Sequence, residues 1–192
     1  IAPIQIIIIP IGKNKEDYNE IKTFLTPLIN ELTKNQIRFK IDDRLTVSPG
    51  YKFNEWEMKG VPIRVEVGPR DMDSQSIMYA RRDTSEKKTC ELKTASGILS
   101  SLLNEIQNFM YDQALNFMHE NTFTVSSYEE FKSAINKGGF IKCGWDGNAQ
   151  TEAAIKLETK ATIRCILAEN DMMKCIYSNQ PAKYEVVYAK AY

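Results

Sequence analysis

Residues 4–41, "IQIIIIPIGKNKEDYNEIKTFLTPLINELTKNQIRFKI", contain the pattern that decides the fold. The β-branched run Ile6–Ile9 predicts a strand that is buried on both faces of a sheet. Across Lys15–Lys34, apolar residues recur every three or four positions and predict a helix, which Pro27 interrupts. The segment Ile37–Ile41 alternates apolar and polar residues, as a strand does. Strand, helix and strand of this length predict a βαβ unit with a parallel sheet.

The rest of the chain completes this domain and adds a smaller one. Alternation predicts strands at Ile63–Val67 and Ile77–Arg82, and an amphipathic helix is expected at Ala95–His119. Ser126, with Glu129 three positions later, has the pattern of a capping box and predicts a helix start. Further elements are expected as a strand at 140–144, a helix at 151–159, and strands at 161–167 and 184–189.

Composition excludes several classes of protein. The chain has 192 residues, with 25 Lys+Arg against 25 Asp+Glu, so unspecific polycation binding to nucleic acid is excluded, although a local basic patch is not. No apolar run approaches the ~18–20 residues of a membrane span, and no signal peptide is visible. The four cysteines are irregularly spaced, which favours free thiols in the cytoplasm. Because the first residue is Ile1, we expect a fragment of a longer protein.

No catalytic residues are predicted. The glycines are too scattered for a phosphate-binding loop. The single histidine, His119, lies at the expected end of a helix, where its charge would be favourable. A small flavodoxin-like enzyme, with a ligand at the strand edge near Asp42–Arg44, stays a hypothesis that the missing loop disfavours.

The proline- and glycine-rich stretch Arg44–Asp71 combines aromatic residues with charges of both signs. Such side chains suit single-stranded RNA, whose bases stack on aromatic or guanidinium planes. A carboxylate can accept from the N1–H and amine of guanine, and an arginine can donate to guanine O6 and N7. Glu57, Arg64 and Arg70 could supply both. The alternative is that Phe53 and Trp56 belong to the core and that Arg64 and Glu66 form a surface ion pair.

Several long segments resemble one family, prolyl-tRNA synthetase of the eukaryotic/archaeal type. "APIQIIIIPI", "DDR" and "SPGYKFNEWEMKGVPIRVEVGPRD" are similar to its anticodon-binding domain, and "IKLETKATIRC" and "KCIYSNQPAKYEVVYAKAY" to its extra C-terminal domain. The resemblance implies an α/β fold, with a mixed, mostly parallel sheet flanked by helices and then a small α+β domain. It implies an anticodon-binding domain at 1–104, a connecting helix at 105–121 and a C-terminal domain at 122–192.

The resemblance also implies a function. The first domain would bind the anticodon loop of proline tRNA and read its second and third bases, both guanines. By position in the family's motifs, Glu57, Arg64 and Arg70 would be the RNA-binding residues, assisted by Lys87 in the loop after the next strand. The terminal Tyr192 would fold toward the catalytic domain, or simply pack on the last strand.

The family's C-terminal domain often holds zinc with four cysteines. The matching positions here are Asp146, Thr151, Cys175 and Ser178, so a single ligand is kept. Cys143 and Cys165 are out of register. One thiolate with these partners is a poor tetrahedral site, and we predict that no zinc binds.

The chain lacks the signature motifs of a class II synthetase, so we expect it to be inactive alone. The parent protein would be a cytoplasmic, homodimeric proline–tRNA ligase that uses ATP and magnesium, and the partners of this fragment would be proline tRNA and its own catalytic domain. A stand-alone adaptor of the same fold, kept for RNA or protein contacts without ligase activity, is the alternative hypothesis.

Overall fold

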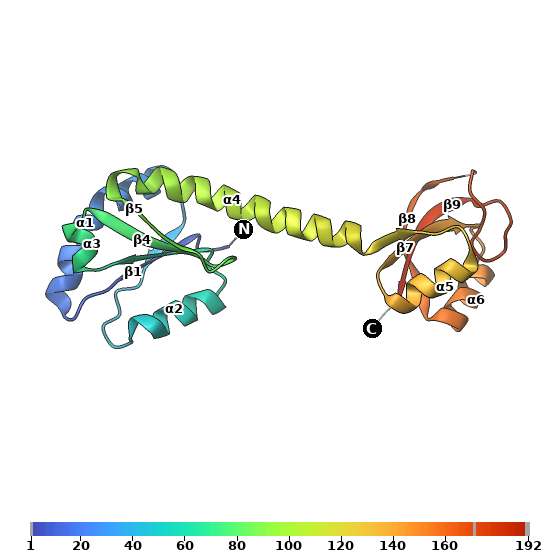
Figure 1. Ribbon diagram of the computed structural model, residues 1–192, viewed down its shortest axis with the longest axis horizontal. Helices are drawn as coiled ribbons and strands as arrows, with labels where there is room; N and C mark the ends of the chain where they lie inside the picture. The colour runs from blue at the N-terminus through green and yellow to red at the C-terminus, as the bar shows by residue number, and fades with distance from the viewer. Residues whose placement is uncertain (1, 171, 191–192) are drawn as a thin grey trace. The chain divides into compact units, whose positions relative to one another are not determined.

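The computed structural model describes residues 2–170 and 172–190. The chain forms two compact units, residues 1–111 and 112–192 (Figure 1). Their boundary falls within one long helix and inside the predicted connecting segment 105–121. The two alternative placements of Tyr192 lie outside the described residues.

The first unit is built on a five-stranded mixed sheet with the strand order β2-β1-β3-β4-β5. Strand β1 pairs in parallel with β2 and β3, whereas β3, β4 and β5 pair antiparallel. The predicted βαβ unit is therefore confirmed. The elements are β1 (Ile6–Pro10), α1 (Lys15–Lys34), β2 (Phe39–Ile41), α2 (Pro49–Met58), β3 (Ile63–Val67), α3 (Pro69–Asp73), β4 (Ser76–Arg81), β5 (Lys87–Glu91) and α4 (Leu92–Glu120).

Helices cover both faces of this sheet (Figure 1). On one face, α1 and α4 pack against Ile6 and Ile8 of β1 in the larger core. On the other face, Trp56 of α2 packs against Ile7 and Ile9. Successive side chains of a strand point to opposite faces, so the four isoleucines serve both cores. The prediction of a doubly buried strand is confirmed.

Helix α1 runs through Pro27 without the predicted interruption. A proline inside a helix loses one backbone hydrogen bond. Here the buried residues Leu25, Leu28 and Leu32 lie on either side of it and pack into the larger core. Burial of three leucine side chains contributes several kcal/mol, roughly 1.5–3 kcal/mol each, and this offsets the lost hydrogen bond.

Strand β5 corrects the expected position of Lys87, which lies in this strand and not in a loop. The strand pairs with β4, and Lys87 is opposite Ala80. Its sequence, "KKTCE", has no apolar alternation because it is an edge strand with mostly exposed side chains. Hydrophobic patterning therefore gave no signal for it.

The second unit is a four-stranded sheet with two helices, in the strand order β6-β7-β9-β8. Both helices and the strands β7, β8 and β9 were predicted, whereas the short strand β6 was not. Phe131 and Ile135 of one helix and Ile155 of the other pack on the sheet in a single core. The cap of the first helix is Ser127, paired with the Glu130 N–H, and not Ser126 with Glu129 as predicted. The elements are β6 (Thr122–Thr124), α5 (Tyr128–Lys137), β7 (Phe140–Trp145), α6 (Ala149–Thr159), β8 (Ala161–Glu169) and β9 (Tyr184–Lys190).

Within residues 2–170 and 172–190, no helix is both long enough and apolar enough to cross a membrane.

Candidate nucleic-acid interface

Helix α2 and strand β3 come from the proline- and glycine-rich stretch and form the candidate site. Ser48 caps the helix, since its Oγ accepts a hydrogen bond from the Tyr51 N–H at 3.3 Å, and Pro49 occupies the first turn. The helix ends before Gly60, whose φ of 76° lies in the left-handed region that favours glycine. The chain reverses there and enters β3, so α2 lies against the sheet face that carries Ile7 and Ile9.

Strand β3 turns its charged side chains toward the α2 side of the sheet. Ile63, Val65 and Val67 belong to the larger core on the opposite face. Arg64 and Glu66 alternate with them, and their side chains are only 9% and 8% exposed. Buried charges are costly unless they are paired and hydrogen-bonded, so this face requires an ion-pair network.

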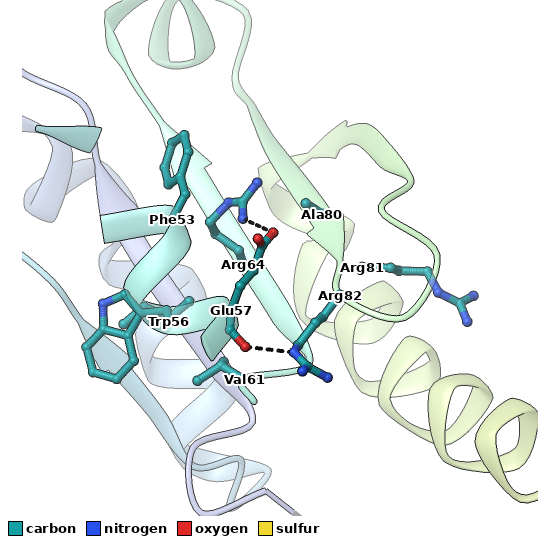
Figure 2. Close-up of a pocket in the computed structure, with 9 residues that line it drawn as sticks. Phe53, Trp56, Glu57, Val61, Arg64, Ala80, Arg81 and Arg82 are labelled. Atoms are coloured by element: carbon teal, nitrogen blue, oxygen red, sulfur yellow. Dashed lines mark hydrogen bonds and ion pairs between the residues drawn. The ribbon is translucent and has the colours of Figure 1, made fainter. Parts of the chain in front are cut away.

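Arg64 is the centre of that network. Its Nε donates to Glu66 Oε1 at 2.8 Å. Its Nη1 donates to Glu57 Oε1 at 2.9 Å, the contact that Figure 2 shows. The Lys87 ammonium lies 3.7 Å from the same Glu66 oxygen. The Arg64 guanidinium also lies 4.2 Å from the centroid of the Phe53 ring, a geometry that stabilises a cation. The structure thus brings together three of the four predicted RNA-binding residues.

The burial of Arg64 restricts what it can offer to a base. Two of its nitrogen atoms are occupied by carboxylates, and its side chain is almost inaccessible. The Glu57 side chain is 49% exposed and that of Lys87 is 52% exposed. The alternative pairing of Arg64 with Glu66 does form, but it is a buried ion pair and not a surface one.

Arg70 lies apart from the other three residues. It is exposed in α3, beyond the carboxyl end of β3, whereas Arg64 is near the start of that strand. Three strand residues separate Arg64 from Val67 by ~10 Å. In the described part of the chain, no hydrogen bond or ion pair joins the Arg70 side chain to Glu57, Arg64 or Lys87.

Arg82 is a further cation at this site that sequence reasoning missed. It is exposed, and its Nε donates to the backbone oxygen of Glu57 at 2.8 Å, at the end of α2 (Figure 2). A cation is favourable at the carboxyl end of a helix. The preceding Arg81 points away and pairs with Asp83 at 2.7 Å and Glu105 at 3.8 Å. The consecutive residues Arg81 and Arg82 could have indicated a cation at this site, but the sequence does not show which of the two faces α2.

The cavity beside the Arg64 ion-pair network is small. The cavity among Phe53, Trp56, Glu57, Arg64 and Arg82 has a volume of about 10 Å³. Such a volume holds about one water molecule and is far too small for a purine. Recognition at this site would therefore use the surface beside α2, where Glu57, Lys87 and Arg82 are accessible.

The strand edge near Asp42–Arg44 is filled by internal contacts. Asp42 is 3% exposed and accepts hydrogen bonds from Trp56 Nε1 at 2.8 Å and from Arg44 at 2.8 and 2.6 Å. Burial opposes its ionisation, yet the hydrogen bonds from Arg44 and Trp56 hold the pKa of this carboxyl well below its ordinary value. The buried Lys52 donates to the Asp42 carbonyl at 3.1 Å and to the Tyr18 hydroxyl at 3.2 Å. These contacts fix α2 to the sheet and to α1.

Two protein-family models match segments of the chain, one in each unit. A model of the anticodon binding domain matches residues 5–102, and a model of the prolyl-tRNA synthetase C-terminal domain matches residues 128–192.

Bacterial relatives match the whole chain. The proline–tRNA ligases of Porphyromonas gingivalis and Amoebophilus asiaticus are each 44% identical over 194 and 195 residues, and that of Chloroflexus aurantiacus is 40% identical over 200. In each case the whole chain is covered, but only 39–41% of the relative. The chain thus spans about two fifths of the length of these relatives. It belongs to the anticodon-binding domain family, and its two domains are those of the C-terminal region of prolyl-tRNA synthetases.

Proposed function

We propose that this chain binds the anticodon loop of proline tRNA and reads its two guanines, as the C-terminal part of a proline–tRNA ligase. The family assignment supports this proposal, and so does the chemistry of the α2–β3 surface. The observation that carries it is the Glu57 carboxylate, which is half exposed and held at 2.9 Å by the buried Arg64.

Glu57 is the proposed acceptor. A carboxylate can accept from both the N1–H and the exocyclic amine on the Watson–Crick edge of an unstacked guanine. One Glu57 oxygen is bound by Arg64, and within the described residues no hydrogen bond reaches the other. Because Arg64 is itself held by Glu66 and by the Phe53 ring, the carboxylate is oriented before RNA binds.

The cations have different roles in this proposal. Arg64 acts as a positioning residue, since its guanidinium is largely enclosed. Lys87, 3.7 Å from Glu66, and Arg82, bound to the backbone oxygen of Glu57, are both accessible and can donate to guanine O6 and N7 or to phosphate. Arg70 lies at the far end of β3, away from Glu57, so Arg70 would contact the guanine that Glu57 does not bind, or the phosphate of that guanine.

The proposal extends to the parent protein. The parent protein would attach proline to tRNA, using ATP and magnesium in a catalytic domain of the same polypeptide. This protein would act as a homodimer in the cytoplasm. We assign it to the eukaryotic/archaeal type because both the anticodon domain and the extra C-terminal domain are matched, although the relatives compared are bacterial. This fragment alone would not aminoacylate tRNA.

Binding of the 192-residue chain to an anticodon stem-loop tests the proposal. The UGG loop should bind more tightly than loops in which a guanine is replaced, by ~1–3 kcal/mol per guanine. Glu57→Ala should abolish much of this discrimination. Arg64→Ala should reduce it through loss of positioning. Equal binding of all loops by the wild-type chain would refute guanine reading and favour the adaptor hypothesis.

A further inference from the structure

The second unit contains a polar cluster at the positions that would hold the family's zinc ion. Asp146 follows β7, Thr151 lies in the first turn of α6, and Cys175 and Ser178 belong to the loop between β8 and β9. These positions form two pairs, Asp146 with Thr151 and Cys175 with Ser178, which lie in separate parts of the sequence. The structure nevertheless gathers them around the Asp146 carboxylate.

Asp146 accepts every hydrogen bond in this cluster. Its Oδ2 accepts from the Ser178 hydroxyl at 2.6 Å and from the Thr151 hydroxyl at 3.0 Å, and its Oδ1 accepts from the Asn148 N–H at 3.0 Å. Burial raises the pKa of the Asp146 carboxyl, but hydrogen bonds from these donors and from Cys175 outweigh it and leave the pKa below its ordinary value. The carboxylate is therefore well satisfied without a metal ion.

The donor set does not fit zinc. Structural zinc sites use thiolates and imidazoles, and here only Cys175 is such a ligand. Ligands of one tetrahedral zinc at ~2.0–2.3 Å from the metal must be ~3.3–3.8 Å apart. The Asp146 oxygen is 2.6 Å from Ser178 and 3.0 Å from Thr151, which are hydrogen-bond distances. In the described residues, no group of three or more Cys, His, Asp or Glu side chains could hold a metal ion.

The cluster does what a structural metal ion would do. It connects the end of β7, the start of α6 and the loop at 172–183. Backbone contacts continue this connection, since the Ile176 N–H donates to the Gly144 carbonyl at 2.9 Å and the Lys183 N–H to the Trp145 carbonyl at 2.8 Å. Gly144 lies so close to the loop that an added Cβ would be 2.4 Å from the Lys174 oxygen. The loop is thus packed directly onto the end of the sheet.

We infer that the Asp146-centred hydrogen-bond cluster replaces the zinc ion in this chain, and that it keeps the arrangement of the metal site while needing no metal. The Asp146 carboxylate takes the place of one ligand and of the ion to which the other ligands would bind. The Thr151 and Ser178 hydroxyls take the places of two further ligands, and each donates a hydrogen bond to this carboxylate. The C-terminal domain is therefore stable in the presence of chelators, and three substitutions would restore a zinc site.

The first experiment measures metal content and chelator sensitivity in the 192-residue wild-type chain. After purification without chelator, elemental analysis should find far less than one zinc per chain, and EDTA should shift the thermal midpoint by less than ~1 °C. Stoichiometric zinc, or a large loss of thermal stability in EDTA, would overturn the inference.

The second experiment restores the metal site. The variant with Asp146→Cys, Thr151→Cys and Ser178→Cys, together with the native Cys175, should bind one zinc per chain. Its cobalt form should show the thiolate-to-metal charge-transfer band of a four-sulfur site. The same variant with Cys175→Ala is the control and should bind more weakly. A folded triple variant that takes up no zinc would show that the four positions do not form a metal-like arrangement.

A third variant keeps the inference testable if the triple variant does not fold. Asp146→Ala should accelerate amide hydrogen exchange in residues 172–183 and lower the thermal midpoint by ~4–8 °C. The matched control is Glu129→Ala, which removes one negative charge from an 85% exposed side chain in the same unit. Unchanged exchange in Asp146→Ala would contradict the role assigned to the cluster.

Discussion

Replacing Arg64 separates the stability of the α2–β3 surface from its recognition of RNA. Arg64→Met keeps the aliphatic stem but removes the cation that pairs with Glu66 at 2.8 Å and with Glu57 at 2.9 Å. Glu66 is 8% exposed, and its remaining cation is the Lys87 ammonium at 3.7 Å. Removing one partner of a buried pair costs ~3–5 kcal/mol. Because Lys87 still partly neutralises Glu66, we expect Arg64→Met to lower the free energy of unfolding by ~3 kcal/mol.

A second substitution identifies the source of this loss. Adding Glu66→Met removes the unpaired buried carboxylate and fills the space with an apolar side chain. Replacing both members of a buried ion pair by apolar residues is often neutral or stabilising. The double variant should therefore recover most of the ~3 kcal/mol, while guanine discrimination stays impaired because Glu57 has lost its positioning partner.

The assay is urea unfolding followed by Trp56 fluorescence, with Trp145→Phe in the background so that only the first unit is observed. Anticodon stem-loop binding is measured on the same proteins. If Arg64→Met unfolds at the urea concentration of the parent, the ion pair does not stabilise the buried face. If the double variant regains full guanine discrimination, Arg64 does not position Glu57.

Two further predictions concern the framework of the site. Because the pKa of Asp42 is depressed in the folded chain, its ionised form contributes stability above its unfolded pKa of ~3.9, and this contribution is lost as the pH falls toward the folded pKa. Asp42→Asn should therefore be destabilising at pH 7 by ~1–3 kcal/mol, and the difference from wild type should shrink below pH ~4 in denaturation curves; a constant difference would contradict the assignment. Gly60→Ala should destabilise by ~1–2 kcal/mol because φ is 76°, although an added Cβ meets no atom within 4 Å. Gly97→Ala, with equal space but inside α4, should stabilise by ~0.5–1 kcal/mol, and the same sign for both glycines would exclude a backbone explanation.

The parts of the fold that follow from apolar periodicity could be predicted from the sequence. Strand β1, helix α1, strand β3 and the long helix α4 bury regular apolar patterns, and their positions were confirmed. Helix α2 was not predicted because it buries only Lys52 and Trp56, so its signals are the Ser48–Pro49 start and the Gly60 end. Strand β5 was not predicted because an edge strand with exposed lysines has no apolar face.

Three of the four predicted site residues come together in the structure, but their geometry could not be predicted. Chemistry and family resemblance indicated Glu57, Arg64, Arg70 and Lys87. Only pairing across α2, β3 and β5 determines that Arg64 is buried between two carboxylates. The contribution of Arg82 depends on its hydrogen bond to the end of α2, a contact between residues 25 positions apart. Such long-range contacts have no local sequence pattern.

A thermodynamic cycle on a single base tests the central role of Glu57 most directly. Inosine has the N1–H, O6 and N7 of guanine but lacks the exocyclic amine, so replacing each anticodon guanine with inosine removes one donor to the proposed carboxylate. The wild-type chain should bind one of the two inosine loops more weakly by ~1 kcal/mol, and Glu57→Gln should bind that loop and the UGG loop about equally. Full discrimination against inosine in Glu57→Gln, or none in the wild-type chain, would contradict the assignment of Glu57 as the guanine acceptor.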